Sequence, residues 1–548
     1  MLSKSECMIH DKGNIFFGAL SENEELLLNI LKNVTEDEDV NVNDNFITLG
    51  LNSIKAGKYI ALINENYKLN LGIDKVFTYP TVKDLACYIA SEKDNLLNVI
   101  KHVEKISKFP ASAQQQRMFA LHTLNPRSTN YNIFTGLMID GAFDYLRAEK
   151  VFLEIINRHE ILRTNFTMEN GDIYQLIHDS IDFNIDYVKD CKNVDEYVNS
   201  YIRSFDLGEE PLIRVLIIEL TRTSYIMVID IHHIISDGST MGIIIKEFCK
   251  LYNGERLEAP KYQYKDYANW QSEYVKSDLF LKEEKYWSQY LEGDLPLLEL
   301  PVDFERQETQ NFDGSRIEIF IGKDRTMKIQ ELSRKYGVTS YMILMSAYSI
   351  LLSKYANQNE VLLGSTIVGR SLAEFMDVMG LFVNTVVFRN KPEPTKTYKE
   401  LLDEIKTDTL NAYANQNYQF DWLIKKIKFK KEKNRNPIFD VMFNMQNMEL
   451  PQINLSGLEI SPFALQDDST RFDLILIINE LPDDIKFEFI YCNKLFADTT
   501  IYKLKDRFIR TLDIVLEEPK IKIGDINLLD VASVDLGEQK ELDFTFSF

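Results

Sequence analysis

Two adjacent histidines, His232 and His233, end an apolar run that begins at Tyr225. With Ile234 and Ile235 after the histidines, the pattern predicts a buried strand over residues 225–235. Successive side chains of a strand face opposite sides, so the two imidazoles cannot both point into one site. Asp237 and Gly238 follow where a helix is expected to begin. We therefore expect His233 to line a reaction channel and His232 to support it.

The chemistry that suits this pattern is acyl transfer. A neutral imidazole, with an ordinary pKa of ~6.5, can take a proton from an attacking amine or hold that amine in line. A buried carboxylate at Asp237 needs a cationic partner, and Arg163 and Arg117 are the candidates. That ion pair would hold the shape of the loop carrying His233. Gly238 would let a thin substrate arm approach closely.

The histidine pair has two other interpretations. A histidine on an apolar strand is most often structural, held by hydrogen bonds or half exposed. A zinc site would need a third ligand at suitable spacing, and the other histidines are scattered. We expect no metal site. The remaining histidines are His10, His102, His122, His159 and His178.

A second candidate for chemistry is Ser53, which follows a loop containing Gly50 and lies where a helix is expected to begin. Helix N-termini favour anionic groups, so a phosphodiester on Ser53 would be well placed. By position alone the simpler interpretation is an N-cap serine.

The elements around these residues form one small helical unit and a larger α+β region. Ser21 and Glu24 predict a capping box before the first helix, and two more helical patterns follow. From Phe109 onward, strand and helix patterns alternate, which suggests two α/β lobes with an active site between them. The predicted segments are a lead segment (1–20), a small helical domain (21–92), a linker (93–108), two lobes (109–285 and 286–530) and a C-terminal linker (531–548).

Composition limits the class of protein. The 548 residues suggest two to four domains. A net charge of −22 argues against a nucleic-acid or anionic membrane partner. The five cysteines are scattered, without CxxC spacing, which indicates reduced thiols and a cytoplasmic location. The sequence shows no signal-peptide layout and no apolar segment of membrane-spanning length.

Four short motifs run through the helical unit: Asp44-Asn45-Phe46, Leu49-Gly50, Ser53-Ile54 and Phe77-x-x-Pro80-Thr81-Val82. With these motifs, residues 21–92 resemble the peptidyl carrier domains of nonribosomal peptide synthetases. Leu51 stands where the family usually has a second glycine. The resemblance implies that Ser53 carries phosphopantetheine, attached by a separate transferase.

The larger region resembles the condensation domains of the same synthetases, whose HHxxxDG signature matches residues 232–238. The resemblance implies two chloramphenicol-acetyltransferase-like lobes in a V, crossed by a tunnel. It makes His233 catalytic and Asp237 structural, with Arg370 and Asn384 as scaffold. Further family motifs are Ser112-x-x-Gln115-x-Arg117-Met118-Phe119, Arg158-His159-Glu160-x-Leu162-Arg163-Thr164-x-Phe166, Tyr264-x-Asp266-Tyr267-Ala268-x-Trp270-Gln271, Gly380-x-Phe382-Val383-Asn384-Thr385 and Arg435-Asn436-Pro437-x-Phe439-x-Val441-Met442-Phe443.

The resemblance implies a carrier–condensation didomain that forms an amide between carrier-bound substrates. The upstream carrier suggests an L-configured donor, although Ser53-Ile54-Lys55 also occurs on carriers that feed epimerization domains. The adenylation domain, the phosphopantetheinyl transferase and the downstream acceptor carrier are expected to act in trans. The alternatives are an acyltransferase of the same superfamily that uses a free acceptor, and a non-catalytic platform that only docks carriers.

Overall fold

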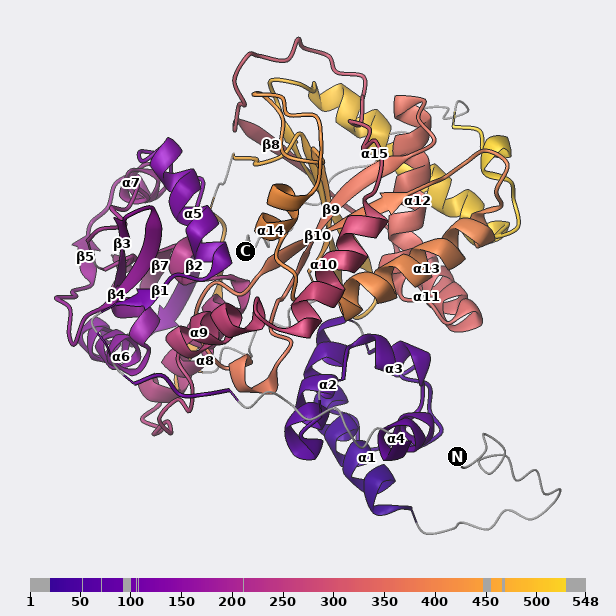
Figure 1. Cartoon of the computed structure of the whole chain (residues 1–548). Helices are drawn as coiled ribbons and strands as arrows, with labels where there is room; N and C mark the ends of the chain where they lie inside the picture. The colour runs from indigo at the N-terminus through magenta and orange to yellow at the C-terminus, as the bar shows by residue number, and fades with distance from the viewer. Residues whose placement is uncertain are drawn as a thin grey trace.

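The computed structural model consists of a small helical bundle and two larger lobes that lie side by side (Figure 1). It describes residues 20–51, 53–69, 71–91, 100–104, 106, 108–209, 211–446, 455–465 and 469–528, and only the backbone of 53 and 54. The predicted fold class, a four-helix bundle followed by two α/β lobes, is confirmed. The predicted lead segment before Leu20, most of the linker and the C-terminal linker lie outside the described residues.

The N-terminal bundle forms because each helix has one apolar face. Ser21 and Glu24 form the predicted capping box at the start of α1. Thr81 and Asp84 exchange similar hydrogen bonds at the start of α4. The buried rings of Phe46 and Tyr59 meet edge to face at the centre of the bundle. Its helices are α1 (Glu22–Thr35), α2 (Ser53–Tyr67), α3 (Asp74–Thr78) and α4 (Val82–Ser91).

The first lobe is built on a five-stranded sheet with the order β12-β2-β7-β6-β5 and on a three-stranded sheet with the order β1-β4-β3. Residues 225–232 of β7 are all buried, as the apolar run predicts. Helices α6 and α8 pack together. The elements are β1 (Phe109–Pro110), α5 (Ala113–Leu124), β2 (Asn132–Gly141), α6 (Tyr145–Arg158), η1 (Glu160–Arg163), β3 (Thr164–Glu169), β4 (Asp172–Ile177), β5 (Asp186–Lys189), α7 (Val194–Tyr201), β6 (Ile213–Thr221), β7 (Ser224–His232), η2 (His233–Ile235), α8 (Gly238–Tyr252) and α9 (Tyr264–Tyr274). The next helix, α10 (Asp278–Tyr290), packs in the second lobe, where Trp287 is buried.

The second lobe has a six-stranded sheet with the order β10-β9-β11-β13-β14-β8. Helix α12 is buried along most of its length, against α13 and α15. The elements are β8 (Gly314–Phe320), α11 (Lys323–Tyr336), α12 (Ser340–Ala356), β9 (Val361–Ile367), η3 (Ala373–Phe375), β10 (Asn384–Asn390), α13 (Tyr398–Ala414), α14 (Phe420–Lys426), β11 (Val441–Met445), β13 (Leu474–Glu480), β14 (Ile485–Cys492), α15 (Asp498–Glu517) and η4 (Ile523–Asp525).

One strand crosses between the lobes. The strand β12 (Leu458–Phe463) follows the second-lobe strand β11 in the chain, yet it pairs antiparallel with β2 in the first-lobe sheet. The chain then returns to the second lobe at β13. This exchange is not predictable from the sequence, because strand periodicity identifies a strand and does not identify the strand it pairs with. The exchange ties the two lobes together through residues Gly136–Gly141 of β2.

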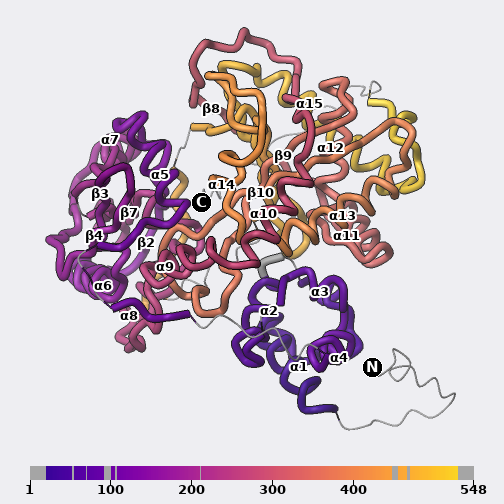
Figure 2. Tube along the Cα trace, viewed as in Figure 1, coloured from indigo at the N-terminus to yellow at the C-terminus, as the bar shows by residue number. Residues whose placement is uncertain are grey.

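The small bundle packs against the second lobe rather than standing apart (Figure 2). Its helix α2 lies against η3, and α3 lies against α13. A Cβ placed on Gly72 would stand 3.8 Å from the Cα of Ala414, at the end of α13. The segment that the bundle touches at η3 also carries Arg370, which matters for the histidine site.

The element boundaries differ from the predictions at one important point. The predicted strand 225–235 ends at His232, and His233–Ile235 form a single 3-10 turn. Among the described residues, no single helix is long and apolar enough to cross a membrane, and α11 and α12 satisfy that criterion only as a pair bent by 105°.

Candidate functional site

His233 leaves the strand and enters a tight turn that fixes its imidazole. Its backbone N–H donates to the carbonyl of Tyr131 at 2.8 Å, at the start of β2. Its Nδ1 lies 2.7 Å from the carbonyl oxygen of Ser236. A carbonyl only accepts, so Nδ1 carries the proton and donates. In the neutral ring this leaves the Nε2 lone pair available as a base.

The surroundings of His233 keep the ring neutral. Burial and, to a smaller extent, the positive charge of Arg471 lower the pKa of His233 to about 4. The Ser236 carbonyl and Asp237 act in the opposite direction and are outweighed. A neutral imidazole at neutral pH can accept a proton and cannot act first as an acid. His233 is still partly exposed, as a residue that meets a substrate must be.

His232 has a different environment, as the alternation along the strand predicts. It is 1% exposed, and its Nδ1 accepts the backbone N–H of Ile234 at 3.0 Å. Its ring meets those of His122 and Phe205 edge to face. Burial holds the pKa of His232 well below its usual range. His232 therefore shapes the turn from inside the core.

Asp237 is buried, and its carboxylate forms a bidentate ion pair with Arg370. The two nitrogen–oxygen distances are 2.7 and 3.1 Å. Asp237 also caps α8 through the backbone N–H of Thr240 at 2.9 Å and accepts the N–H of Phe382 at 3.1 Å. A buried charge needs such a complete set of partners. Asp237 is thus structural by geometry, and it joins the histidine turn to the second lobe.

The segment around Gly380 makes further contacts between the second lobe and the start of α8. The hydroxyl of Thr240 lies 2.9 Å from the Gly380 carbonyl and 3.0 Å from its N–H. Gly380 has φ +148°, and a Cβ there would lie 1.9 Å from the ring of Tyr264. Only glycine fits against that ring. The predicted motif 380–385 therefore connects the second lobe to the start of α8 in the first lobe.

The predicted partners of Asp237 were wrong. Arg163 donates to the carbonyls of His178 and Asn157, in its own lobe. Arg117 lies 3.6 Å from Asp421 of α14 and stacks over the ring of Phe420. Both arginines belong to motifs that precede the histidines in the chain, whereas the true partner, Arg370, follows Asp237 by 133 residues. The family resemblance implies a scaffold role for Arg370 and Asn384 and assigns no partner to either residue.

Asn384 and Gly238, two further predicted site residues, lie at the starts of β10 and α8. Asn384 is buried and donates to the carbonyls of Gln416 and Tyr418, which fixes the start of β10. Gly238 is the first residue of α8. Its proposed role in admitting a substrate arm stays a prediction.

Ser53 begins α2, as predicted. Its side chain lies outside the described residues. The first turn of α2 contains no acidic residue, and Gly50 in the preceding loop has φ +75°. A helix start without carboxylates can accept a phosphodiester, so the local backbone and charge fit a phosphopantetheine group.

The remaining predictions concern metal and thiols. The described residues contain no group of three or more His, Cys, Asp or Glu arranged to hold a metal ion. The four cysteines within those residues, Cys87, Cys191, Cys249 and Cys492, form no disulfide.

Two family models match the chain. Residues 105–535 match the Condensation domain family, and residues 25–89 match the Phosphopantetheine attachment site family. The chain is 36% identical over 495 residues to surfactin synthase subunit 2 of Bacillus subtilis (strain 168), covering 90% of this chain and 14% of that protein. It is 36% identical over 503 residues to gramicidin S synthase 2 of Brevibacillus brevis, covering 91% and 11%. The chain thus spans about a tenth to a seventh of these two relatives.

Solved structures agree on the fold. The complex of the X-domain and OxyB from teicoplanin biosynthesis matches with a TM-score of 0.73 at 20% identity, covering 79% of this chain and 98% of the matched chain. The first condensation domain of the calcium-dependent antibiotic synthetase, in complex with a substrate analogue, matches with a TM-score of 0.63 at 14% identity, covering 77% and 98%.

Proposed function

Because this chain belongs to the Condensation domain family and carries a Phosphopantetheine attachment site before that domain, we propose that it is the carrier–condensation part of a nonribosomal peptide synthetase and forms amide bonds. The acceptor amine attacks the donor carbonyl carbon, the C–N bond forms and the C–S bond breaks. The observation that carries this proposal is the neutral, partly exposed His233 with its Nε2 available as a base.

His233 accepts one proton in this reaction. Its Nδ1–H stays on the Ser236 carbonyl, so the ring cannot turn while Nε2 takes the proton from the attacking amine. The proton then passes to the departing thiolate, so that thiol and amide are the products. Asp237 and Arg370 hold the turn and take no part in the proton transfer.

Ser53 is the proposed attachment residue on α2. Phosphopantetheine, when bound there, supplies the thiol that carries the donor acyl group. The backbone N–H groups at the start of α2 would hold its phosphodiester. Since α2 lies against η3, and η3 follows Arg370 in the chain, the bundle sits close to the segment that clamps the histidine turn. This packing favours donor delivery from within the same chain.

The other participants are proposed to act in trans. These are an adenylation domain, a phosphopantetheinyl transferase that modifies Ser53, and a downstream carrier bearing the acceptor amine. The proposed domain limits are 21–92 for the carrier and 109–285 and 286–530 for the two lobes. We propose no nucleic-acid or membrane partner, and a cytoplasmic location.

The test uses the full chain in its apo form, onto which a phosphopantetheinyl transferase transfers the aminoacyl-phosphopantetheine group from each of a panel of aminoacyl-coenzyme A donors. Intact-protein mass spectrometry first checks that Ser53→Ala abolishes the mass gain. Aminoacyl-pantetheine acceptors are then added, and dipeptide formation is followed. His233→Ala should load normally and lose the reaction, by ~10²- to 10⁴-fold for loss of a general base. His102→Ala, which removes a largely exposed histidine, should behave as wild type.

Each alternative has its own outcome. Equal rates with free amines or alcohols would replace the proposal with an acyltransferase that uses free acceptors. Normal Ser53 loading without product from any pair would favour a docking platform, and unchanged product formation by His233→Ala would remove His233 from the catalytic role.

A further inference from the structure

Arg471 belongs to the second lobe, but its side chain reaches the first lobe beside the histidine turn. Its Nε donates to the carbonyl oxygen of Asn130 at 2.8 Å, and its Nη2 donates to the same oxygen. The guanidinium carbon stands 4.9 Å from the centre of the Tyr131 ring. Two fork nitrogens on one carbonyl and a stacked ring fix a guanidinium more tightly than a single contact would.

The loop that Arg471 holds is the loop that holds His233. Tyr131, next to Asn130, gives its carbonyl to the backbone N–H of His233 at 2.8 Å. The loop is short and internally bonded, since Asn132 donates to the carbonyl of Thr129 at 2.8 Å. A shift at Asn130 is therefore passed to the start of the His233 turn within two peptide units.

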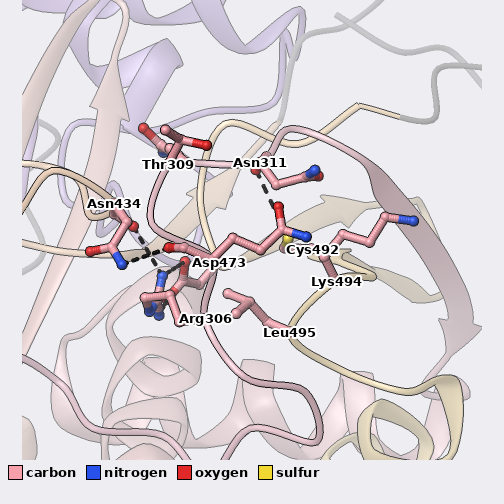
Figure 3. A pocket seen from close by; sticks show the side chains of 10 residues that line it. Arg306, Thr309, Asn311, Asn434, Asp473, Cys492, Lys494 and Leu495 are labelled. Carbon is pink, nitrogen blue, oxygen red and sulfur yellow. Dashed lines mark hydrogen bonds and ion pairs between the residues drawn. The ribbon is translucent and has the colours of Figure 1, made fainter.

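The root of Arg471 is anchored in the second lobe. Its carbonyl accepts the side-chain amides of Gln310 at 3.2 Å and Asn436 at 3.0 Å. Two residues on, Asp473 forms an ion pair with Arg306, at the polar pocket drawn in Figure 3. The pocket is lined by Arg306, Gln307, Thr309, Gln310, Asn311, Asn434, Asp473, Cys492, Lys494 and Leu495. A flexible root would let the guanidinium drift, and this network prevents it.

We propose that Arg471 is a positioning residue for the condensation reaction: from the second lobe it holds the Asn130–Tyr131 loop, and through that loop it sets the position of His233. The proposal rests on the proposed catalytic role of His233. It assigns to residue 471 a role that no motif in the sequence indicated.

Electrostatics give this role a second, measurable consequence. The positive charge of Arg471 lowers the pKa of His233, while Asp237 raises it. The nearby rings of His232 and His122 both have lowered pKa values because of burial, so they add no charge near neutral pH. Removing the charge at position 471 should raise the pKa of His233, whereas a lysine there should keep it low.

The first experiment needs no substrate. Full-length protein is labelled with ¹⁵N-histidine, and the His233 signals are identified by their loss in His233→Ala. In wild type the ring should remain neutral down to pH 5. In Arg471→Met its pKa should rise by about one unit, and in Arg471→Lys it should stay near the wild-type value. An unchanged pKa in Arg471→Met would overturn the electrostatic part of the proposal.

The matched control is Arg507→Met. Arg507 also stacks on a tyrosine, with its guanidinium carbon 5.1 Å from the Tyr355 ring centre, and donates to the Tyr355 hydroxyl at 2.8 Å. This pair joins α15 to α12 inside the second lobe, away from the histidine turn. Both arginines are partly buried, so a general loss of packing should affect the two variants equally.

The second experiment measures dipeptide formation with the donor–acceptor pair that wild type uses best. Arg471→Met should lose ~10- to 100-fold in rate, the scale expected when a catalytic group is displaced by about 1 Å, with normal Ser53 loading. Arg471→Lys, which lacks the fork, should lose rate while His233 keeps its low pKa. Rates in both Arg471 variants within twofold of Arg507→Met would overturn the positioning role. If wild type itself makes no product, the proposed function fails. The histidine titration still tests whether the charge of Arg471 acts on His233.

Discussion

Two arginines of the second lobe reach the histidine turn, and they differ in nearly every physical respect. Arg370 is buried and paired bidentately with Asp237. Arg471 is partly buried and holds a backbone carbonyl. The first contact neutralises a charge inside the protein, and the second lies where its charge lowers the pKa of His233. Arg370 therefore stabilises the contact between the lobes, whereas Arg471 affects the pKa of His233.

The difference follows from the energetics of burial. A buried carboxylate that loses its partner is left charged in a poor solvent, which is costly. A carbonyl that loses an arginine at a partly exposed site can bond to water instead, which costs little. We therefore expect substitution of Arg370 to lower mainly the free energy of unfolding and substitution of Arg471 to lower mainly the reaction rate.

The largest effect is expected for Arg370→Met. This change leaves Asp237 buried and unpaired, and breaking one partner of a buried pair costs about 3–5 kcal/mol. Chemical unfolding followed by circular dichroism measures the free energy of unfolding. Adding Asp237→Asn removes the stranded charge, so the double variant should be less destabilised than the sum of the two single changes. Strict additivity would mean that the ion pair does not carry the stability assigned to it.

The fold was predictable from the sequence to the extent that local periodicity decides it. The apolar run before His232, the capping box at Ser21 and the carrier helix starting at Ser53 all follow from spacing along the chain. The ion pair of Asp237 was not predictable in this way, because its partner, Arg370, lies in the other lobe.

Two further contacts between the lobes could not be predicted from local spacing along the chain. The pairing of β12 with β2 depends on a chain that leaves one lobe and returns. Arg471 belongs to no motif quoted from the sequence, and its importance comes only from the loop it touches. The residues proposed to do the chemistry carried a local signal, and the residues proposed to position them from the other lobe carried none.

A smaller effect is expected for Arg117→Met, the residue once expected to pair with Asp237. Its Nε stands 3.6 Å from Asp421, and its side chain is 34% exposed. Partly exposed ion pairs at such distances contribute about 0–1 kcal/mol. The same unfolding measurement should therefore show a loss of at most about 1 kcal/mol. A loss as large as that of Arg370→Met would mean that burial does not separate the arginine contacts between the lobes.

The smallest effect is expected from acidifying the wild-type protein. An ordinary histidine would lose half of its neutral form near pH 6.5, and a base with that pKa would lose activity in parallel. The pKa of His233 is lowered to about 4, so the rate of amide formation should stay flat between pH 7.5 and 6, when it is corrected for the protonation of the acceptor amine. In Arg471→Met the fall should begin at higher pH, because the cation that opposes protonation is gone. Arg370→Lys should leave the onset unchanged, because it keeps a cation opposite Asp237. An equal shift in both variants would show that the lobe contact as a whole, and not the charge of Arg471, keeps His233 neutral.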